Sequence, residues 1–571
     1  IPALFMGLYP GLSALNIMVG DENGAYRLDD TIIRSEVAKM AIHALGLEDA
    51  AESSKGQTVF DDVSAEHWAN GYINLAVSQG IIEGDGDGNF RPNAPISYAE
   101  AMTIMVRATG YTVSAEENGG YPHGYMKTGT SNGLAKNVQG SYSDKISRGN
   151  VAYLTTNALE SKLMEQTGFG SDGKYEITEK TLLKDKLKVT KDTGRITAIE
   201  NTSLTGSSSL AKGQIKIDNK TYETAYNMNN LLGYNVTYYV KNEGKNDESV
   251  ILAMPIQNQN NDLTISSELF SKLTTKNGNT AIEYFKDENT SKTNTAEISS
   301  DATLIYNGKY QAMDKNLIDL TDKSGNITLL DSNKNGKYDI VFVKNYENIV
   351  VDSVSSTGKI VDKYSQKVLK LDDTVDFRIT KGLEEISVSD LAEYDVLSVA
   401  ASLDKELYEV EVTNKTVEGK VTGKDSKGVL INGTKYKVAA NYTDSIDIGS
   451  EGVFYLDTDG KIAAFDASAT LSSNYAYLMK AYYTKNTEKA SFKLFTKDGK
   501  EVTLDANNKI KFNGKSNVKA LDVVNSLNTS EDVTASQLVT YSTNADNKIT
   551  AINTAVDNSE SGAVNTDKFT K

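Results

Sequence analysis

The feature that most constrains this chain is an internal repeat near its N-terminus. The segment Ile17–Leu28 returns 64 residues later as Ile81–Pro92, and the same register then continues through Glu36 and Glu100. Self-similarity at a fixed period indicates one supersecondary unit used several times, with neighbouring copies sharing a core. What the repeat binds is therefore a more direct route to function than a search for a catalytic site.

Each copy of the repeat predicts a helix, a loop rich in glycine and aspartate, and a second helix. Apolar residues recur at spacings of three and four residues from Val37 to Leu45, and again from Ala101 to Ala108. A glycine stands just beyond each run, at Gly46 and Gly110, where the C-terminus of a helix favours a residue that tolerates positive φ. The N-terminal segment is therefore predicted to be helical.

The most complete copy lies between residues 60 and 100. Its defining residues are Phe60-Asp61-Asp62-Val63, Trp68, Ile73, Ala76, Gly80-Ile81-Ile82, Gly84-Asp85-Gly86, Phe90-Arg91-Pro92, Ile96 and Ala99-Glu100. This order and spacing resemble the S-layer homology (SLH) module of bacterial cell-surface proteins. A truncated copy precedes it and a diverged third copy follows, so the resemblance covers about 165 residues. Because the chain begins within the first copy, we expect a further segment before residue 1.

The resemblance and a change in composition together predict the domain organisation. The resemblance implies an all-α, pseudo-trimeric bundle of three SLH repeats at the N-terminus. Near residue 165 the usage changes, since five of the six prolines, five of the seven arginines, the tryptophan and all three histidines come before it. Such a shift is typical of a domain boundary.

The tail beyond this point predicts a tandem array of small all-β domains, sandwich-like or barrel-like. Val236–Val240 and Val453–Leu456 are β-branched and aromatic runs. Asn-Gly pairs, which favour tight hairpins, separate such runs at Asn307-Gly308, Asn432-Gly433 and Asn513-Gly514. The predicted boundaries are SLH repeats at 1–50, 51–115 and 116–166, then β-domains at 167–257, 258–352, 353–415, 416–468 and 469–571.

Arginine placement is the sharpest chemical signal. The tail carries its positive charge almost wholly on lysine, whereas Arg34 and Arg148 occupy the same place in the first and third copies, at the start of a predicted helix. Arginine holds a carboxylate or phosphate through two parallel hydrogen bonds, which lysine cannot do. A helix N-terminus adds backbone donors and a favourable dipole for an anion.

At this place the SLH family has a threonine-arginine-alanine-glutamate motif, and the resemblance implies binding to an anionic secondary cell-wall polysaccharide that often carries pyruvate ketals. Carried over by position, the candidate polysaccharide-binding residues are Arg34, Ser35, Trp68, Ser147 and Arg148. Trp68 is either a ligand platform or a core residue, because it lies between apolar positions.

The three copies depart from the family motif in different ways. Ile33 replaces the threonine of the first copy, Tyr98 replaces the arginine of the second, and Asn150 replaces the glutamate of the third. At most two of the three grooves between repeats therefore have the arginine. In the alternative interpretation the two arginines only pair with a carboxylate such as Glu36. We expect Glu36 and Glu100 to bond backbone N–H groups at the helix starts.

One acidic turn in the tail is a candidate calcium-binding loop. Residues Asp331, Asn333, Asn335 and Asp339 supply oxygen ligands at positions one, three, five and nine, with glycine at six, as in an EF-hand loop. Phe342 stands at position twelve, where a bidentate glutamate is needed. A plain hairpin turn is the alternative. The sequence therefore establishes no cofactor, and Ca²⁺ is a candidate ligand of this turn.

Composition and the absence of catalytic motifs narrow the classes of protein to which this chain can belong. The chain has no cysteine and a net charge of −17, which argues against thiol chemistry and against nucleic acid as a partner. No apolar run is long enough for a membrane span, and no catalytic motif stands out. We therefore predict a secreted, non-enzymatic S-layer protein of the cell wall. Its predicted partners are wall polysaccharide, bound by the SLH module, and copies of itself, bound through the β-domains.

Two alternatives remain from the sequence. The first is an SLH-anchored adhesin or scaffold, which exposed aromatic platforms in the β-domains would favour. The second is a wall-bound glycan-degrading enzyme, which two close carboxylates in a cleft would favour.

Overall fold

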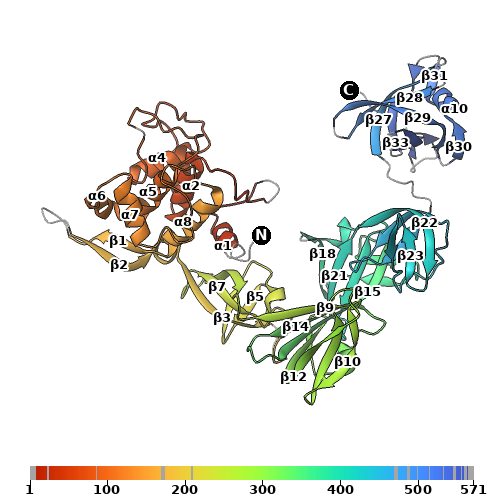
Figure 1. Ribbon diagram of the computed structural model, residues 1–571, viewed down its shortest axis with the longest axis horizontal. Helices are drawn as coiled ribbons and strands as arrows, with labels where there is room; N and C mark the ends of the chain where they lie inside the picture. The colour runs from red at the N-terminus through yellow and green to blue at the C-terminus, as the bar shows by residue number, and fades with distance from the viewer. Residues whose placement is uncertain are drawn as a thin grey trace. The chain divides into compact units, whose positions relative to one another are not determined.

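The computed structural model describes most of the chain, namely residues 8–21, 25–84, 86–168, 174–206, 210–382, 384–467, 474–484, 489–497, 499–513, 515–530, 533–543, 548–554, 556–557 and 562–563. Figure 1 labels the helices and strands along the chain. The chain divides into two compact units, the first made of Ile1–Asp319 with Ile327–Val343 and the second of Leu320–Asn326 with Lys344–Lys571. Within the described ranges, no helix has the length and apolar character that a membrane span requires.

The first unit begins with the helical repeats. Their helices are α1 (Leu8–Ala14), α2 (Arg34–Ala44), α3 (Glu48–Ser53), α4 (Asn70–Ser78), α5 (Tyr98–Ala108), α6 (Thr112–Glu117), α7 (His123–Ser131) and α8 (Arg148–Glu160). The helices α2, α5 and α8 begin at equivalent positions of the three repeats. The predicted helical runs of the first two repeats are therefore confirmed, as are the positive φ values of Gly46 (+67°) and Gly110 (+84°) beyond them.

The three repeats are joined by a ring of backbone hydrogen bonds just before α2, α5 and α8. The N–H of Ile32 donates to the carbonyl oxygen of Ile146, that of Ile146 to Ile96, and that of Ile96 to Ile32, over 3.1–3.2 Å. All three isoleucine side chains are buried. Because each repeat supplies one donor and one acceptor, the ring holds the starts of the three helices side by side.

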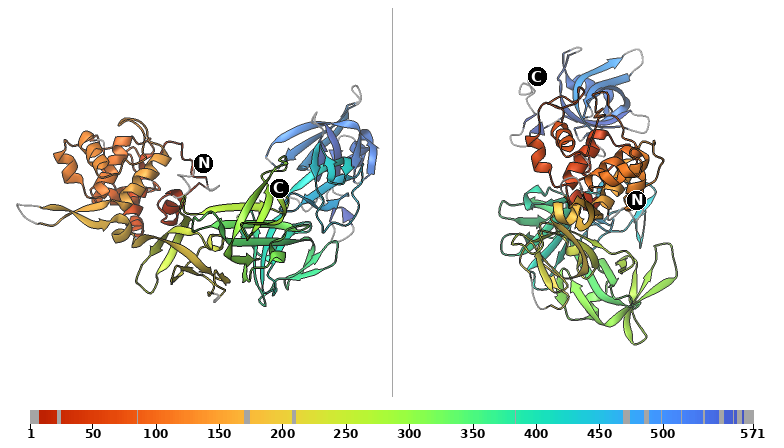
Figure 2. Two further views of the ribbon diagram at one scale, coloured as in Figure 1. Left: turned by 60° about the horizontal axis from the view of Figure 1, so that its bottom comes forward. Right: turned by 90° about the vertical axis from the view of Figure 1, so that its left-hand side faces the viewer.

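The prediction of a separate all-α bundle is wrong, because the helices share their core with strands. Leu163, Leu182, Leu183, Val189 and Tyr239 belong to the same buried cluster as the helical residues. They come from β1 (Lys162–Gln166), a short π-helix η2 (Leu182–Lys186), β3 (Val189–Ile199) and β7 (Asn235–Lys241). Figure 2 shows strands running directly on from the helices. The composition shift near residue 165 is therefore not a boundary of the hydrophobic core.

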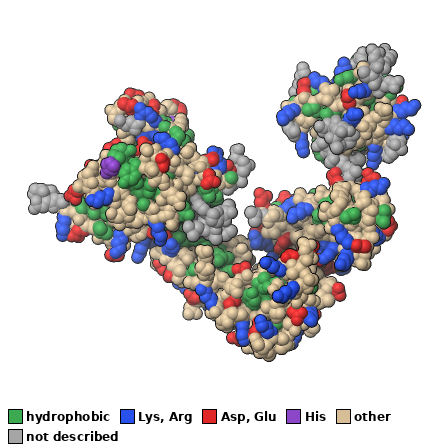
Figure 3. Space-filling view, in the orientation of Figure 1, with side chains coloured by type: hydrophobic (Ala, Val, Ile, Leu, Met, Phe, Trp, Pro, Cys, Tyr) green, Lys and Arg blue, Asp and Glu red, His purple; other side chains and the backbone are tan. Residues whose placement is uncertain are grey.

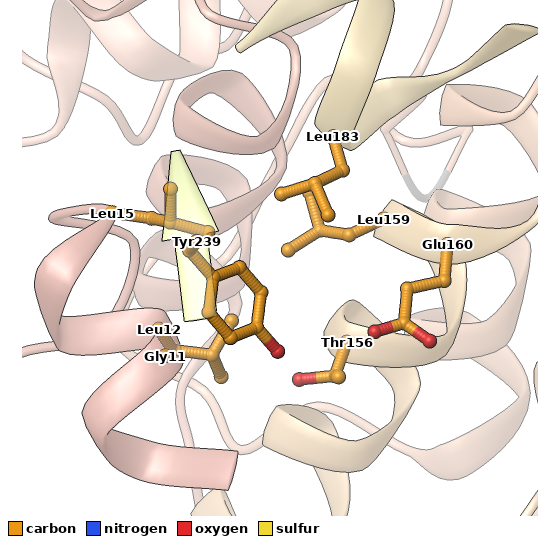
Figure 4. A pocket seen from close by; sticks show the side chains of 8 residues that line it. All are labelled: Gly11, Leu12, Leu15, Thr156, Leu159, Glu160, Leu183 and Tyr239. Carbon is orange, nitrogen blue, oxygen red and sulfur yellow. The ribbon is translucent and has the colours of Figure 1, made fainter. Parts of the chain in front are cut away.

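A close contact and a small cavity show how the strands meet the helical core. A Cβ on Gly110, at the end of α5, would lie only 2.1 Å from the carbonyl oxygen of Met164 in β1. A small cavity of about 20 Å³ lies between helices α1 and α8, Leu183 and Tyr239, and the hydroxyls of Tyr239 and Thr156 point toward each other across it (Figure 4). The sequence does not reveal this arrangement, since the apolar residues involved are scattered along the tail.

The remainder of the first unit is β structure. β1 pairs with β2 (Tyr175–Thr181). A second sheet consists of β3, β4 (Thr202–Ser203), β5 (Gln214–Ile217), β6 (Lys220–Glu223), β7 and β8 (Ser249–Pro255). It closes on itself, because β3 pairs with both β5 and β7. The short helix η3 (Asn229–Leu231) precedes β7.

A larger sheet follows along the chain. Its strands are β9 (Asn261–Ser266), β10 (Phe270–Lys276), β11 (Asn279–Phe285), β12 (Thr293–Tyr306), β13 (Lys309–Gln311), β14 (Ser324–Asp331) and β15 (Tyr338–Val354), with α9 (Lys315–Ile318) before β14. β12 runs parallel to the first part of β15. The Asn307-Gly308 pair forms the predicted two-residue turn, with φ of 43° and 81°.

The second unit contains the rest of this sheet and a smaller one. The second half of β15 pairs with β16 (Lys359–Asp362) and with β20 (Val396–Ala401). The other strands of this sheet are β17 (Val368–Lys370), β18 (Asp376–Lys381), β19 (Glu384–Ile386) and β21 (Leu407–Thr413), and η4 (Val388–Asp390) precedes β20. The smaller sheet has the order β24 (Thr434–Tyr436), β23 (Gly428–Ile431), β22 (Thr416–Asp425), β25 (Glu451–Leu456) and β26 (Ile462–Asp466).

The last part of the second unit is a barrel. Its strands are β27 (Asn474–Thr484), β28 (Lys489–Thr496), β29 (Glu501–Phe512), β30 (Lys515–Lys519), β33 (Gln537–Thr543) and β34 (Ile549–Thr554), and α10 (Ala520–Leu527) packs on its core. The pairing of β28 with β29 closes the ring, and β30 adds to its edge. Two two-stranded pairs complete the described structure, β31 (Asn528–Ser530) with β32 (Val533–Thr534) and β35 (Val556–Asp557) with β36 (Gly562–Ala563). The predicted β-rich tail is thus confirmed.

Candidate functional site

Arg34, the first residue of α2, is held against the second repeat. Its side chain is only 10% exposed. The Nε atom donates to the carbonyl oxygen of Phe90 over 2.7 Å, and Nη1 lies 2.5 Å from Oε1 of Glu100. The guanidinium carbon is 5.0 Å from the centre of the Phe90 ring, a distance at which a cation is attracted to an aromatic face.

Arg148, the first residue of α8, makes the same set of contacts with the first repeat. Its Nε donates to the carbonyl oxygen of Tyr26 over 3.1 Å, and Nη1 lies 2.5 Å from Oε1 of Glu36. Tyr26 and Glu36 stand 64 residues before Phe90 and Glu100, so the two sites are equivalent. Nη2 of Arg148 has no protein partner within the described part of the chain. Each arginine therefore bridges two repeats.

The third junction, between the second and third repeats, has no cation at the equivalent position. Tyr98 replaces the arginine and is 5% exposed, and burial raises the pKa of its hydroxyl. Asn150 replaces the glutamate, and its amide exchanges hydrogen bonds with the backbone of Gln139. This junction therefore lacks the arginine–glutamate pair that the other two share.

Hydrogen bonds at the start of α5 orient Glu100. The hydroxyl of Ser97 accepts the N–H of Glu100, while Oε2 of Glu100 accepts the N–H and O–H of Ser97 over 2.7 and 2.6 Å. Burial disfavours the ionised form of Glu100, but the Ser97 hydrogen bonds and the charge of Arg34 outweigh it and hold its pKa below the ordinary value. Glu100 is therefore a fixed carboxylate that positions Arg34, and it bonds backbone N–H as the sequence predicted.

Tyr121 is a residue of this site that the sequence analysis missed. It is 58% exposed. Partial burial and the neighbouring charge of Glu100 raise the pKa of its hydroxyl, which also interacts with Ser97. It therefore lies at the rim of the Arg34–Glu100 pair. Nothing in the repeat pattern marks it, since it lies in a loop before α7.

The other predicted site residues have different surroundings. Ser147 caps α8, with its hydroxyl accepting the N–H of Asn150 over 3.3 Å. Ser35 is fully buried, and its hydroxyl has no hydrogen-bond partner in the described structure. Trp68 is 49% exposed and stacks on His67, so it is not the core residue of the alternative interpretation.

The acidic turn joins β14 to β15 and bonds largely to itself. Oδ2 of Asp331 accepts the N–H of Gly336, and the side-chain oxygens of Asn333 and Asn335 accept N–H groups two residues ahead. Asp339 accepts the N–H and O–H of Ser332 and forms an ion pair of 2.9 Å with Arg195. These are the bonds of a hairpin turn, but Oδ1 of the 3% exposed Asp331 has no partner in the described structure.

Comparisons with known proteins agree with this description of the N-terminal repeats. Residues 59–102 match the S-layer homology domain. The chain is 27% identical to the "Middle cell wall protein" of Brevibacillus brevis, over 88% of this chain and 55% of that protein. It is 25% identical to the "Surface layer protein" of Brevibacillus choshinensis, over 86% and 50% respectively. It is 26% identical to the "Cell surface protein" of Thermoanaerobacter kivui, over 97% and 67%.

These comparisons confirm the predicted SLH domain at residues 59–102 and show that the chain is similar to proteins named for the cell wall and the surface layer. The chain spans about half of the length of the two Brevibacillus relatives. Shorter matches, over 16–19% of the chain, include proteins named as enzymes. The similarity along the tail is therefore to proteins named for the wall and the surface layer.

Proposed function

We propose that this chain is the anchoring and lattice-forming part of a structural surface-layer protein. Its N-terminal repeats bind an acidic secondary cell-wall polysaccharide, and its β-rich parts associate with copies of the same chain. The observation that carries the proposal is the pair of equivalent arginine sites, Arg34 with Glu100 and Arg148 with Glu36.

The geometry suits a carboxylate on a sugar. Each glutamate accepts from one edge of a guanidinium, and on Arg148 this leaves Nη2 for an incoming anion at the start of a helix. Guanidinium–carboxylate contacts are directional and stronger than those between neutral groups. A ketal-linked pyruvate offers such a carboxylate. Two of the three junctions would bind it, and the junction at Tyr98 would not.

The proposal assigns no catalytic role. The relatives aligned over most of the chain are named for the cell wall or the surface layer, whereas those named as enzymes match only 16–19% of it. Matches of that length correspond to a shared retention module and not to a shared reaction.

The proposal that the ligand is an acidic polysaccharide is tested with purified, protein-free cell walls. Mild acid treatment removes ketal-linked acidic groups and leaves the glycan backbone. We expect the full chain to sediment with untreated walls and to lose at least tenfold in affinity for treated walls, because one lost charged contact corresponds to about 1.5–3 kcal/mol. Equal binding to both preparations would contradict an acidic ligand.

A further inference from the structure

The C-terminal barrel differs from the rest of the chain in charge. Residues 474–554 contain eleven lysines and eight aspartates and glutamates, a net charge of +3, so the other residues together carry −20. In Figure 3 the visible face of this barrel has more lysine than carboxylate side chains. The barrel is therefore a cationic element in an acidic protein.

Three of its lysines form one face of β29 and β30. Ile510, Phe512 and Val518 pack on the barrel core, and alternation along a strand places the intervening side chains on the opposite face. This basic face consists of Lys509, Lys511 and Lys519. Lys509 and Lys519 stand directly opposite each other in the ladder, where two like charges are unfavourable.

The described residues supply no counter-charge to the basic face. Two other lysines of the barrel, Lys489 and Lys493, form ion pairs with Asp505 and Glu501. Among the described residues, no carboxylate lies within 4.0 Å of the three lysines of the basic face. Among the described strands, β30 pairs with β29 alone and stands at the end of the strand order. An uncompensated cluster of like charges at a sheet edge is suited to an anionic partner.

The strongest acidic stretch of the chain lies elsewhere in the second unit. Residues 372–411, the acidic segment, contain twelve aspartates and glutamates and three basic residues, a net charge of −9. Asp373, Asp376 and Glu384 are exposed and have no basic partner in the described structure. Asp373 precedes β18, Asp376 is its first residue and Glu384 is the first residue of β19, the end strand of its sheet. Phe377 adds an apolar side chain that is 37% exposed.

We propose that the basic face of one chain docks on the acidic segment of a second copy. The inference rests on the proposed self-association and names the two surfaces that make it. Because the two surfaces differ, the contact is heterologous, and each docked pair of chains leaves one free surface of each kind. Such a contact propagates into an extended array, and salt weakens it because exposed charges are screened.

The test is a charge-reversal cycle in the full chain. Lys509→Glu, Lys511→Glu and Lys519→Glu together should abolish assembly, measured by light scattering and by electron microscopy of the purified protein. The matched control reverses Lys245, Lys286 and Lys292, three exposed lysines of the first unit, with the same change in net charge. The control should assemble at a concentration within about threefold of wild type.

The reciprocal variant, Asp373→Lys with Asp376→Lys and Glu384→Lys, should also fail to assemble. Both sets combined in one chain restore opposite charges across the contact and should restore assembly. Failure of the combined variant, with each variant folded by circular dichroism, would overturn the pairing of these two surfaces. Restoration that does not depend on protein concentration would place the contact within one chain and would also overturn the proposal.

Two further outcomes distinguish a failure of this docking contact from a failure of the proposed self-association. If the wild-type chain does not assemble, the proposed self-association itself fails. If the basic-face variant assembles normally but binds purified walls at least tenfold more weakly, the occupant is the polysaccharide and not a second copy.

Discussion

Arg34 and Glu100 form an ion pair of 2.5 Å between the first and second repeats, and Arg148 and Glu36 repeat it between the third and first. The ring of backbone bonds through Ile32, Ile96 and Ile146 brings these residues together. The same arginines are thus both ties between repeats and the candidate anion-binding groups. Their two roles can be separated by experiment.

The structural role predicts a loss of stability in Arg34→Ala. The substitution removes hydrogen bonds to Phe90 and Glu100 and leaves Glu100, whose side chain is 28% exposed, without its cation. We expect the first unit to lose about 1–3 kcal/mol of unfolding free energy in urea. Adding Glu100→Gln should recover part of that loss, because no unpaired carboxylate then remains. Fully additive effects of the two changes would show that the pair is not coupled.

The pH dependence follows from Glu100, whose pKa is lower in the folded chain than the ordinary 4.5. Burial alone would raise it, but the Ser97 hydrogen bonds and Arg34 outweigh burial. A carboxyl whose pKa falls on folding stabilises the fold above its unfolded pKa, and that stability is lost as the pH falls through the folded pKa. We expect the urea concentration at the unfolding midpoint of the first unit to decrease once the pH is below about 4.5. The fall should be smaller in Glu100→Gln, and an equal fall in both proteins would assign it to other carboxyls.

The shared core predicts where the N-terminal part can be cut. A fragment of residues 1–166 lacks Leu182, Leu183, Val189 and Tyr239, which are at most 8% exposed in the common core. Each fully buried leucine contributes about 1.5–3 kcal/mol by burial. We therefore expect residues 1–166 to unfold at lower temperature than residues 1–343, measured by circular dichroism. Equal melting temperatures would show that the helical repeats form an independent domain.

Calcium binding at the turn from Asp331 to Asp339 stays a prediction. The free Oδ1 of Asp331 and the neighbouring amide oxygens suit a weak Ca²⁺ site, although Arg195 competes for Asp339. At ten times its dissociation constant, Ca²⁺ should stabilise the folded chain by about 1.4 kcal/mol. The melting temperature should rise with Ca²⁺ more than with Mg²⁺, which requires stricter geometry. Asp331→Asn should abolish this rise in melting temperature. If a chelator does not change the melting temperature of the wild-type chain, the segment is a plain hairpin turn.

The sequence predicts local structure well where the pattern is periodic or the turn chemistry is specific. The helices after Ile33 and Ser97 follow from apolar spacing, and the turns at Asn307 and Asn432 follow from their Asn-Gly pairs. These features depend on neighbours close in sequence.

What the sequence could not give depends on long-range contacts. The partner of Arg34 is Glu100, 66 residues away, and only the ring of repeats brings the two together. Tyr239 completes a helical core from a strand far along the chain, with no local pattern to indicate it. The composition shift near residue 165 suggested a boundary because it reflects surface and turn residues more than core residues.

The most direct test of the account is calorimetry of the full chain with isolated wall polysaccharide. The variant carries Arg34→Ala and Arg148→Ala, and the control carries Arg27→Ala and Arg91→Ala. The control arginines also stand at equivalent positions, with side chains 60% and 46% exposed. The account predicts that the variant loses at least tenfold in affinity, since each charged contact corresponds to about 1.5–3 kcal/mol, while the control stays within about twofold of wild type. Wild-type affinity in a folded Arg34→Ala, Arg148→Ala variant would contradict it.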